Sequence, residues 1–192
     1  YHCWKTNGHG KMHVVDAIKQ SCDVFFYEIS KQLGIDKIAE VAKDFGLSQT
    51  FEISLPNQKK GIIPNKKWKK NKMGESWYAG ETLIAGIGQG FVLTNPLQLA
   101  VMTSIIASDG KYVKPTLVKN NNNVFKTNKK YLNEIQIIKK ALFKVVNEKK
   151  GTAYNSRLED IKFAGKTGTS QVKRITLSER ESDDFRKKEQ EW

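Results

Sequence analysis

Residues 163–172 leave few options for the fold of this chain, because a lysine, two threonines and a glycine stand at 166–169 and lead into a strand-like run. A strand edge of this kind binds a peptide through its backbone, and the cation and hydroxyls suit a carboxylate. The letters Gly-Lys-Thr also end phosphate-binding loops, but such a loop needs another glycine where this chain has Asp160, and a helix should follow it. For this segment alone a plain glycine turn between two strands is the better explanation, and a ligand-binding strand edge is the alternative that other site residues would have to support.

Apolar spacing along the rest of the chain indicates helices interrupted by short strands. Asp23 can cap the helix that it begins, and the Phe and Tyr residues that follow it indicate a buried core helix. Residues 51–95 are expected to be mostly loop. Helices that cover an antiparallel sheet make an α+β domain. We expect helices at 14–21, 23–34, 35–45, 96–108 and 134–148, and strands at 112–118 and 161–164.

The charge balance is strongly basic, with a formal net charge of +13 at pH 7, which favours polyanions such as nucleic acid, anionic lipid or acidic polymer. Residues 59–72 contain seven lysines and no acidic residue. Because Gly61 and Pro64 interrupt the stretch and Trp68 stands alone, we favour a solvated loop over a nucleic-acid stripe. We therefore expect no nucleic-acid partner.

Ser21-Cys22-Asp23 lies between the first two expected helices. A serine at such a junction has a hydroxyl free to relay a proton, and Asp23 can hydrogen-bond to its neighbours and fix the loop. Ser and Asp are also ordinary helix-capping residues, and for these three residues alone that structural role is the better explanation. A Ser-x-Asp followed much later by Lys-Thr-Gly favours a catalytic site instead.

With these residues in view, the chain resembles the class B penicillin-binding proteins, and among them the elongation-type penicillin-binding protein 2 subfamily. The likeness covers nearly the whole chain, and several motifs in the subfamily's order are more specific than any one of them. The motifs are Ser-Cys-Asp-Val-Phe-Phe-Tyr at 21–27, Trp77-Tyr78-x-Gly80-Glu81-Thr82, Gly86-Ile87-Gly88-Gln89-Gly90, Thr94-x-Pro96-x-Gln98, Gly151-Thr152-Ala153 and Lys166-Thr167-Gly168-Thr169.

The resemblance implies an α+β transpeptidase domain of the penicillin-binding/β-lactamase-like fold, with a helical cluster packed on an antiparallel sheet. It also implies a peptidoglycan DD-transpeptidase that acts on D-Ala-D-Ala stem peptides through a serine acyl-enzyme. Such an enzyme cross-links the wall during elongation, maintains cell shape and is a target of penicillin.

The same resemblance implies roles for individual residues. Ser21 would relay protons, Asp23 would order the network, and Lys166 would keep the relay poised and attract the substrate carboxylate. The hydroxyls of the following threonines would contact that carboxylate, and one backbone N–H, that of Thr169, would stabilise the oxyanion. The substrate-binding residues would be Thr167, Gly168 and Thr169.

The family's nucleophile motif, Ser-x-x-Lys, is expected upstream of Ser21, where this chain has none. Ser108–Lys111 falls on a turn. Ser170–Lys173 falls on an expected strand, where positions i and i+3 face opposite sides. We reject both as nucleophile motifs. We therefore expect residues 1–192 to be an internal part of a single transpeptidase domain, without its nucleophile region and its last strands and helix.

That interpretation carries expectations about the intact protein. It would lie in the bacterial inner membrane with its catalytic domain facing the periplasm. Its partners would be peptidoglycan stem peptides, β-lactams and a membrane glycosyltransferase of the elongation machinery. The part given by residues 1–192 would be inactive alone and marginally stable or insoluble, because apolar core would be exposed.

The two cysteines, Cys3 and Cys22, could form a disulfide, remain free or bind a metal with nearby histidines. Thiolate and imidazole are ligands that zinc prefers, although the spacing is unlike that of a compact zinc finger. The resemblance favours zinc, since several subfamily members bind it beside this loop with ligands that match Cys3, His9 and Cys22 and an acidic ligand further upstream. His2 and His13 are spare imidazoles. We expect Zn²⁺ ahead of a disulfide, and otherwise no cofactor.

Two alternative functions stay open from sequence. One is a DD-carboxypeptidase or β-lactamase of the same superfamily, although the lysine-rich insertion at 57–75 and the elongation-type motifs argue against a compact β-lactamase. The other, from a different class, is a non-catalytic basic module that binds polyanions, and only the net charge supports it.

Overall fold

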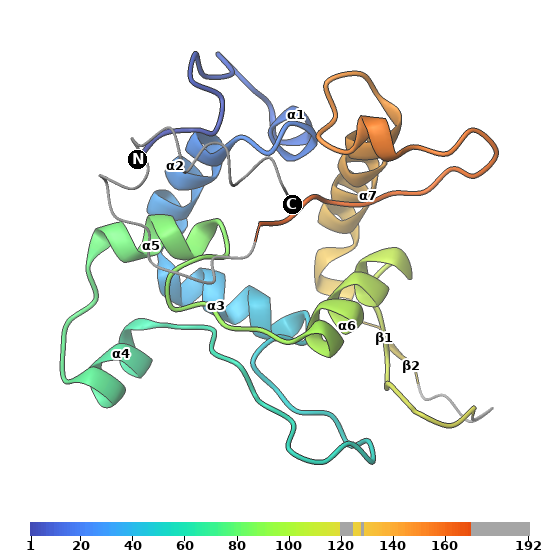
Figure 1. Ribbon diagram of the computed structural model, residues 1–192. Coiled ribbons are helices and arrows are strands. Elements are labelled where there is room, and N and C mark those ends of the chain that lie inside the picture. The colour runs from blue at the N-terminus through green and yellow to red at the C-terminus, as the bar shows by residue number, and fades with distance from the viewer. Residues whose placement is uncertain (120–124, 128, 170–192) are drawn as a thin grey trace, which may run out of the picture.

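The computed structural model describes residues 1–119, 125–127 and 129–169, which form helices and one small antiparallel sheet (Figure 1). None of the helices within these residues combines the length and the apolar character that a bilayer span requires. In chain order the elements are α1 (Val14–Lys19), α2 (Asp23–Leu33), α3 (Ile35–Asp44), α4 (Lys66–Met73), α5 (Ala79–Gly86), α6 (Pro96–Ala107), β1 (Lys111–Val113), β2 (Phe125–Thr127), the 3-10 turn η1 (Lys129–Tyr131), α7 (Leu132–Asn147) and the 3-10 turn η2 (Tyr154–Ser156).

The helices pack in pairs, with α1 against α7 and α2 against α5, while α6 packs against β1 (Figure 1). Ala17 of α1 and Ala141 and Val145 of α7 have no exposed surface. Small side chains at a helix contact allow the two axes to approach closely. The α1–α7 pair therefore forms a tight seam between the first and last parts of the described chain.

Most helix boundaries follow the sequence pattern. The helices expected at 23–34, 35–45, 96–108 and 134–148 are confirmed as α2, α3, α6 and α7. The start of α6 shows why the boundaries can be read from sequence. The Asn95 side chain accepts a hydrogen bond from Gln98 N at 3.0 Å, and Pro96 occupies the first turn. Asparagine at the cap and proline just inside it are the usual signals of a helix start.

The expected cap of α2 is wrong. Cys22 is the residue before the first turn, and no side chain caps this helix. The Asp23 carboxylate instead accepts a hydrogen bond from the backbone N–H of Trp4 at 3.1 Å. The acid still lies in the first turn, where a negative charge favours a helix.

The expected burial of α2 is also wrong. Phe25 and Phe26 are only partly buried, packed against Cys3, Ala17 and Cys22. Other apolar side chains of the helix are exposed to solvent. The exposed apolar side chains of this helix are Val24 (42%), Ile29 (37%) and Leu33 (54%).

The expected strand at 161–164 is not formed, and residues 161–169 have no regular secondary structure. A strand is defined by its ladder of hydrogen bonds, and no partner strand lies beside this segment in the described residues. The segment is held by α7 instead, since Gly165 N donates to Leu142 O at 3.2 Å and Asn147 Nδ2 donates to Phe163 O at 2.8 Å. The strand expected at 112–118 is likewise shorter, because only β1 has a partner.

Two helices, α4 and α5, occupy residues expected to be loop. The Asn65 side chain caps α4 by accepting a hydrogen bond from Trp68 N at 2.7 Å, and Gly74 ends the helix in the left-handed conformation. At the start of α5, the Tyr78 N–H donates to the Glu81 carboxylate at 2.9 Å. Both helices are marked in the sequence by signals at their ends and not by apolar spacing.

One residue of the basic stretch, Lys69, is buried, with 1% of its side chain exposed. Its Nζ donates to Glu81 at 2.5 Å, lies 3.5 Å from Glu75 and sits 4.2 Å from the centre of the Tyr78 ring. Burial opposes the charged amine, but the two carboxylates outweigh it and raise the pKa of Lys69. A buried cation persists when it is paired in this way. The residue therefore joins α4 to α5.

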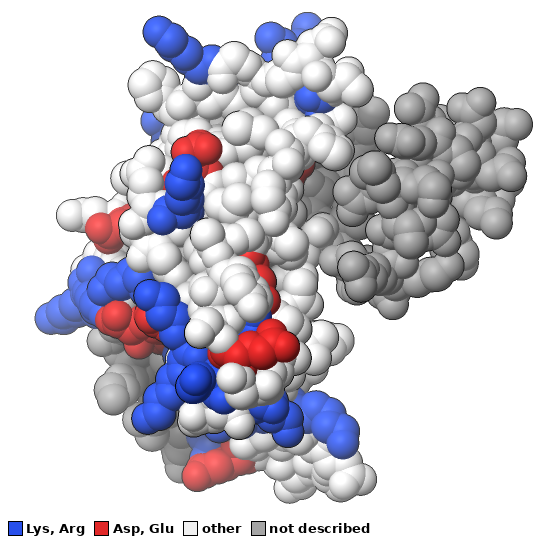
Figure 2. All heavy atoms as spheres, turned by 90° about the vertical axis from the view of Figure 1, so that its left-hand side faces the viewer, with Lys and Arg blue, Asp and Glu red and all other residues white. Residues whose placement is uncertain are grey.

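The other lysines of this stretch are at the surface. Figure 2 shows Lys and Arg side chains gathered on the lower part of the face that carries α4, with acidic side chains among them. The solvated surface expected for this stretch is confirmed for these lysines, although part of it is a helix and not a loop. The exposed lysines are Lys59, Lys60, Lys66, Lys67, Lys70 and Lys72.

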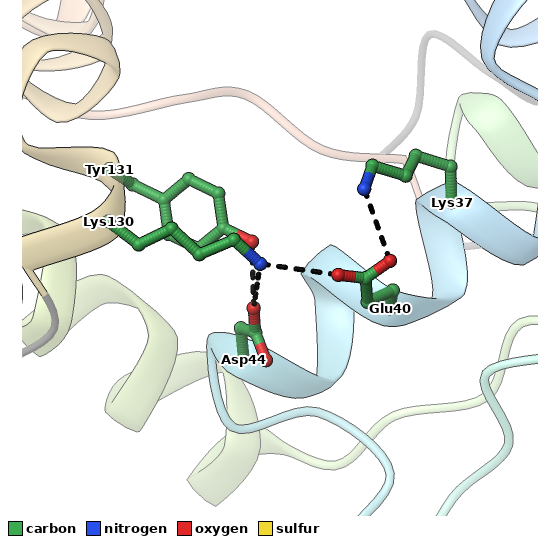
Figure 3. Close-up of polar contacts among 5 residues, drawn as sticks. All are labelled: Lys37, Glu40, Asp44, Lys130 and Tyr131. Atoms are coloured by element: carbon green, nitrogen blue, oxygen red, sulfur yellow. Dashed lines mark hydrogen bonds and ion pairs between the residues drawn. The ribbon is translucent and has the colours of Figure 1, made fainter.

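A polar cluster fastens the start of α7 to α3 (Figure 3). Lys130 Nζ lies 3.2 Å from both the Glu40 and Asp44 carboxylates, and the Tyr131 hydroxyl donates to Asp44 at 2.7 Å. The bonds from Tyr131 and Lys130 lower the pKa of Asp44, and those from Lys130 and Lys37 lower the pKa of Glu40. Both carboxyl groups are thus charged at neutral pH. Each exposed pair contributes little by itself, but together they orient α7.

The α2–α5 contact depends on Ser30 and Gly86. Ser30 is 4% exposed, and a Cβ added to Gly86 would overlap the Ser30 hydroxyl oxygen and lie 2.5 Å from Ser30 Cβ. Real Cβ atoms do not approach other atoms that closely. The glycine is therefore required by the close approach of the two helices and not by a turn.

Candidate active site

Ser21 and Lys166 meet at the junction between α1 and α2. Lys166 Nζ lies 2.5 Å from Ser21 Oγ and donates to its neighbour's carbonyl, Thr167 O, at 2.9 Å. The two residues are 145 positions apart in sequence. The structure thus brings together the serine and the lysine that the sequence analysis paired.

The backbone of Ser21 is fixed by its surroundings. Its φ of +50° lies in the left-handed region, which residues other than glycine rarely adopt. Trp4 Nε1 donates to the carbonyls of Gln20 at 3.1 Å and Ser21 at 2.9 Å, and Cys22 N donates to Ala17 O at 2.9 Å. Sequence reasoning gave Trp4 no role, and its contact across the N-terminal loop leaves no local signal.

Two threonine hydroxyls complete a cluster around Ser21. Thr152 Oγ1 lies 2.8 Å from Thr167 Oγ1, and each of these oxygens lies 3.4 Å from Ser21 Oγ. Lys166 Nζ is also 3.4 Å from Thr167 Oγ1. The site therefore places one amine and three hydroxyls within hydrogen-bonding reach of one another. Sequence reasoning recognised Gly151-Thr152-Ala153 as a motif but gave it no chemistry.

The amine of Lys166 is partly desolvated. The residue as a whole is exposed, but its Nζ is directed towards Ser21 and Thr167 and loses hydration there. This desolvation lowers the pKa of Lys166, and the nearby charge of Asp23 opposes the shift. A lowered amine pKa makes proton exchange with a neighbouring hydroxyl easier. The amine and the hydroxyls of the cluster are the kinds of group that a proton relay uses.

The remaining predicted residues lie outside the cluster. Asp23 forms no hydrogen bond with Ser21 or Lys166 in the described residues, and it influences the amine only through its charge. Gly168 and Thr169 are exposed, and the space beside Gly168 is open. This edge can accept a ligand carboxylate from solvent. The Thr167 hydroxyl, in contrast, faces Thr152.

The rejected nucleophile motif at Ser108–Lys111 does not form a site. Ser108 follows the last turn of α6 and Lys111 opens β1, so they do not share a helical face. Ser170–Lys173 lies outside the described residues. Within the described chain, no Ser-x-x-Lys pair therefore accompanies Ser21.

A second cluster lies beside the site. Ligand atoms of Cys3, His9 and Cys22 lie within 4.8 Å of one another, and both thiols are free. Cys3 Sγ is 3.4 Å from His9 Nδ1, while His9 Nε2 is buried without a hydrogen-bond partner in the described residues. Two thiols and an imidazole this close together are the donor set of a soft metal site.

The environment of this cluster favours uncharged side chains. Burial, together with the charge of Lys5, lowers the pKa of His9. Burial, with a smaller effect from the neighbouring Cys3, raises the pKa of Cys22. A neutral imidazole is the form that binds metal.

Comparison with known proteins agrees with this architecture. The model of the penicillin binding protein transpeptidase domain matches residues 1–183. The peptidoglycan D,D-transpeptidase MrdA of Acinetobacter baumannii is 34% identical over an alignment of 188 residues that covers 92% of this chain and 28% of that protein.

Solved structures give the same result. A penicillin-binding protein (PBP2) from Helicobacter pylori matches with a TM-score of 0.85 at 36% identity, over 90% of this chain and 33% of that one. A complex of PBP2 and MreC from Helicobacter pylori matches with a TM-score of 0.84. This chain thus spans about a third or less of the length of these relatives, and the expected fold is confirmed. It belongs to the transpeptidase-domain family of the penicillin-binding proteins.

Proposed function

We propose that this chain is part of a peptidoglycan DD-transpeptidase that cross-links D-Ala-D-Ala stem peptides during cell elongation. The observation that carries the proposal is the 2.5 Å contact between Lys166 Nζ and Ser21 Oγ beside an open Lys-Thr-Gly-Thr edge. The likeness to MrdA and PBP2 supports it. The chain would supply the proton relay and the carboxylate-binding edge, and a serine elsewhere in a longer chain would make the attack.

The reaction would proceed in two transfers. The serine oxygen attacks the carbonyl carbon of the penultimate D-Ala, the C–N bond breaks, and the terminal D-Ala leaves with the serine's proton. An amine of a neighbouring stem peptide then attacks the ester, forms the new amide and returns a proton to the serine. Ser21 would pass protons in both steps, and Lys166 would attract the terminal carboxylate. The Thr169 N–H would stabilise the oxyanion, a contribution of about 3 kcal/mol in comparable sites.

The setting of the intact protein is part of the same proposal. The PBP2 of Helicobacter pylori has been solved with MreC, which supports a place in an assembly. We place the intact protein at the bacterial inner membrane with the catalytic domain in the periplasm. A membrane glycosyltransferase would supply its glycan strands.

We expect the full-length protein to be acylated covalently by a fluorescent penicillin, because a β-lactam ring is attacked by the same serine. Labelling should change little with salt concentration, whereas polyanion binding by the exposed lysines would fall steeply. Gel fluorescence after denaturation measures it. Absence of labelling would contradict the proposed function. Incubation with a D-Ala-D-Ala stem peptide separates a transpeptidase, which forms cross-linked product, from a carboxypeptidase, which releases only D-Ala.

We also propose that Cys3, His9 and Cys22 hold a Zn²⁺ ion together with one acidic ligand from another part of the protein. Support comes from the two free thiols and from the ligand atoms of the three residues, which lie within 4.8 Å of one another. When bound, zinc would act as a structural cross-link. It would tie the N-terminal loop to the start of α2, and so to the loop that carries Ser21.

We expect the purified full-length protein to contain about one zinc per chain, consistent with a structural site. The Cys22→Ser variant should lose most of that zinc, because a hydroxyl is a far poorer zinc ligand than a thiolate. His13→Ala is the matched control, since His13 is exposed and outside the cluster. Mass spectrometry of the metal content measures both. A metal-free wild type with a Cys3–Cys22 disulfide would overturn the proposal.

A further inference from the structure

We propose that Thr152 is a positioning residue of this site, whose hydroxyl keeps the Ser21 and Thr167 hydroxyls together so that Ser21 faces Lys166. The inference rests on the proposed function, because it assigns a residue to that reaction. It adds a residue that comes from the turn after α7 and from neither the Ser-x-Asp nor the Lys-Thr-Gly segment.

The backbone at Thr152 is clamped between α1 and α7. Thr152 N donates to Lys19 O at 3.2 Å, at the end of α1, and Ala153 N donates to Val145 O at 3.1 Å, on α7. The preceding Gly151 packs so closely on α7 that an added Cβ would lie 2.6 Å from Lys144 O. The turn therefore has little freedom to move relative to the helices.

The side chain can serve both neighbours at once. A threonine hydroxyl has one donor and two acceptor lone pairs, and Thr152 Oγ1 lies 2.8 Å from Thr167 Oγ1 and 3.4 Å from Ser21 Oγ. Threonine is also branched at Cβ, which restricts rotation about χ1. A rigid side chain on a clamped turn holds its hydroxyl in one place.

Thr152 links the two segments whose meeting makes the site. The Ser21 hydroxyl lies 3.4 Å from both Thr152 Oγ1 and Thr167 Oγ1, and these two threonine oxygens are 2.8 Å apart. Thr152 thus holds the Thr167 hydroxyl firmly and gives Ser21 a second hydroxyl neighbour. Without the Thr152 hydroxyl, the side chains of Ser21 and Thr167 keep, within the described residues, only their own long contact and their contacts with Lys166. A displacement of about 1 Å in such a site can lower a rate by roughly 10²-fold.

The test is the rate of acylation of the full-length protein by a fluorescent penicillin. Thr152→Val, which keeps the shape and removes the hydroxyl, should lower the rate about 10- to 100-fold, and Thr152→Ser should restore it to within a few-fold. Thr103→Val is the matched control, because it removes an exposed hydroxyl that donates to Leu99 O on α6. In a Ser21→Ala background, Thr152→Val should have almost no further effect if it acts through Ser21.

The outcomes separate this inference from the proposed function. An unchanged rate in Thr152→Val overturns the inference and leaves the function standing. A fall that Thr152→Ser does not rescue, or one as large in the Ser21→Ala background, also overturns it. If the wild type is not acylated, the function fails, and a crystal structure of Thr152→Val decides the inference. A Lys166 Nζ to Ser21 Oγ distance above hydrogen-bond range supports it, and an unchanged distance overturns it.

Discussion

Replacing Lys166 by alanine should lower the rate of acylation of the full-length protein by about 10²–10³-fold, the usual cost of removing a group that transfers protons or stabilises charge in the transition state. The physical reason is its position. Its amine is the only cation that contacts the Ser21 hydroxyl in the described residues, at 2.5 Å, and it is partly desolvated. Pre-steady-state labelling with a fluorescent penicillin measures the rate.

Two further variants define the role of this lysine. Lys67→Ala is the control, because Lys67 is an exposed residue of α4 on the basic surface, and it should be acylated at the wild-type rate. Lys166→Arg keeps the charge but has a side chain that does not give up its proton. If Lys166 only attracts the carboxylate, the arginine variant retains most of the rate, whereas a role in the relay predicts a loss close to that of alanine. Wild-type rates in both Lys166 variants would remove this residue from the site.

Gly86→Ala should destabilise the protein by about 2–3 kcal/mol, within the range for overpacking a tight contact. Alanine is normally the better helix former by about 1 kcal/mol. The expected change in stability therefore has the opposite sign to the change that helix propensity alone would give. The cause is the overlap of the new Cβ with the Ser30 side chain between α2 and α5. Thermal unfolding of the purified protein should shift by roughly 5–10 °C at this size.

The double variant Ser30→Gly/Gly86→Ala separates a clash from other causes. Ser30→Gly alone should destabilise, since glycine weakens a helix by about 1 kcal/mol. Combined with Gly86→Ala it should stabilise relative to Gly86→Ala alone, because it removes both atoms that the new Cβ meets. Additive losses in the double variant would contradict a direct contact between these two residues.

The helices predicted from sequence are those with apolar spacing or strong end signals. The start of α6 at Asn95-Pro96 and the amphipathic pattern of α7 are local features that need no tertiary information. Helix α4 was missed because its sequence, Lys-Lys-Trp-Lys-Lys-Asn-Lys-Met, has no apolar face. Its Asn65 cap and Gly74 stop were available as signals. The burial of Lys69 was not, because it depends on Glu81 from another helix.

The residues of the site fall into the same two groups, those with a local sequence signal and those without one. The Ser21 and Lys166 segments could be found because each carries a recognisable short motif, and family resemblance links them. The contacts that shape the site could not, since Trp4 and Thr152 reach Ser21 from distant parts of the chain. The strand expected at 161–164 could not be judged locally either, because its sequence is strand-like but no partner strand lies beside it in the described residues.

The packing of α1 against α7 can alter the geometry of this site without altering any of its functional groups. Ser21 follows the end of α1, while Thr152 and Lys166 follow α7, and the two helices pack against each other. A change in this packing would shift the Ser21 segment relative to the Thr152 and Lys166 segments with every functional group still present. The geometry of this cluster can thus change through the packing of two helices, by residues that lie outside the cluster.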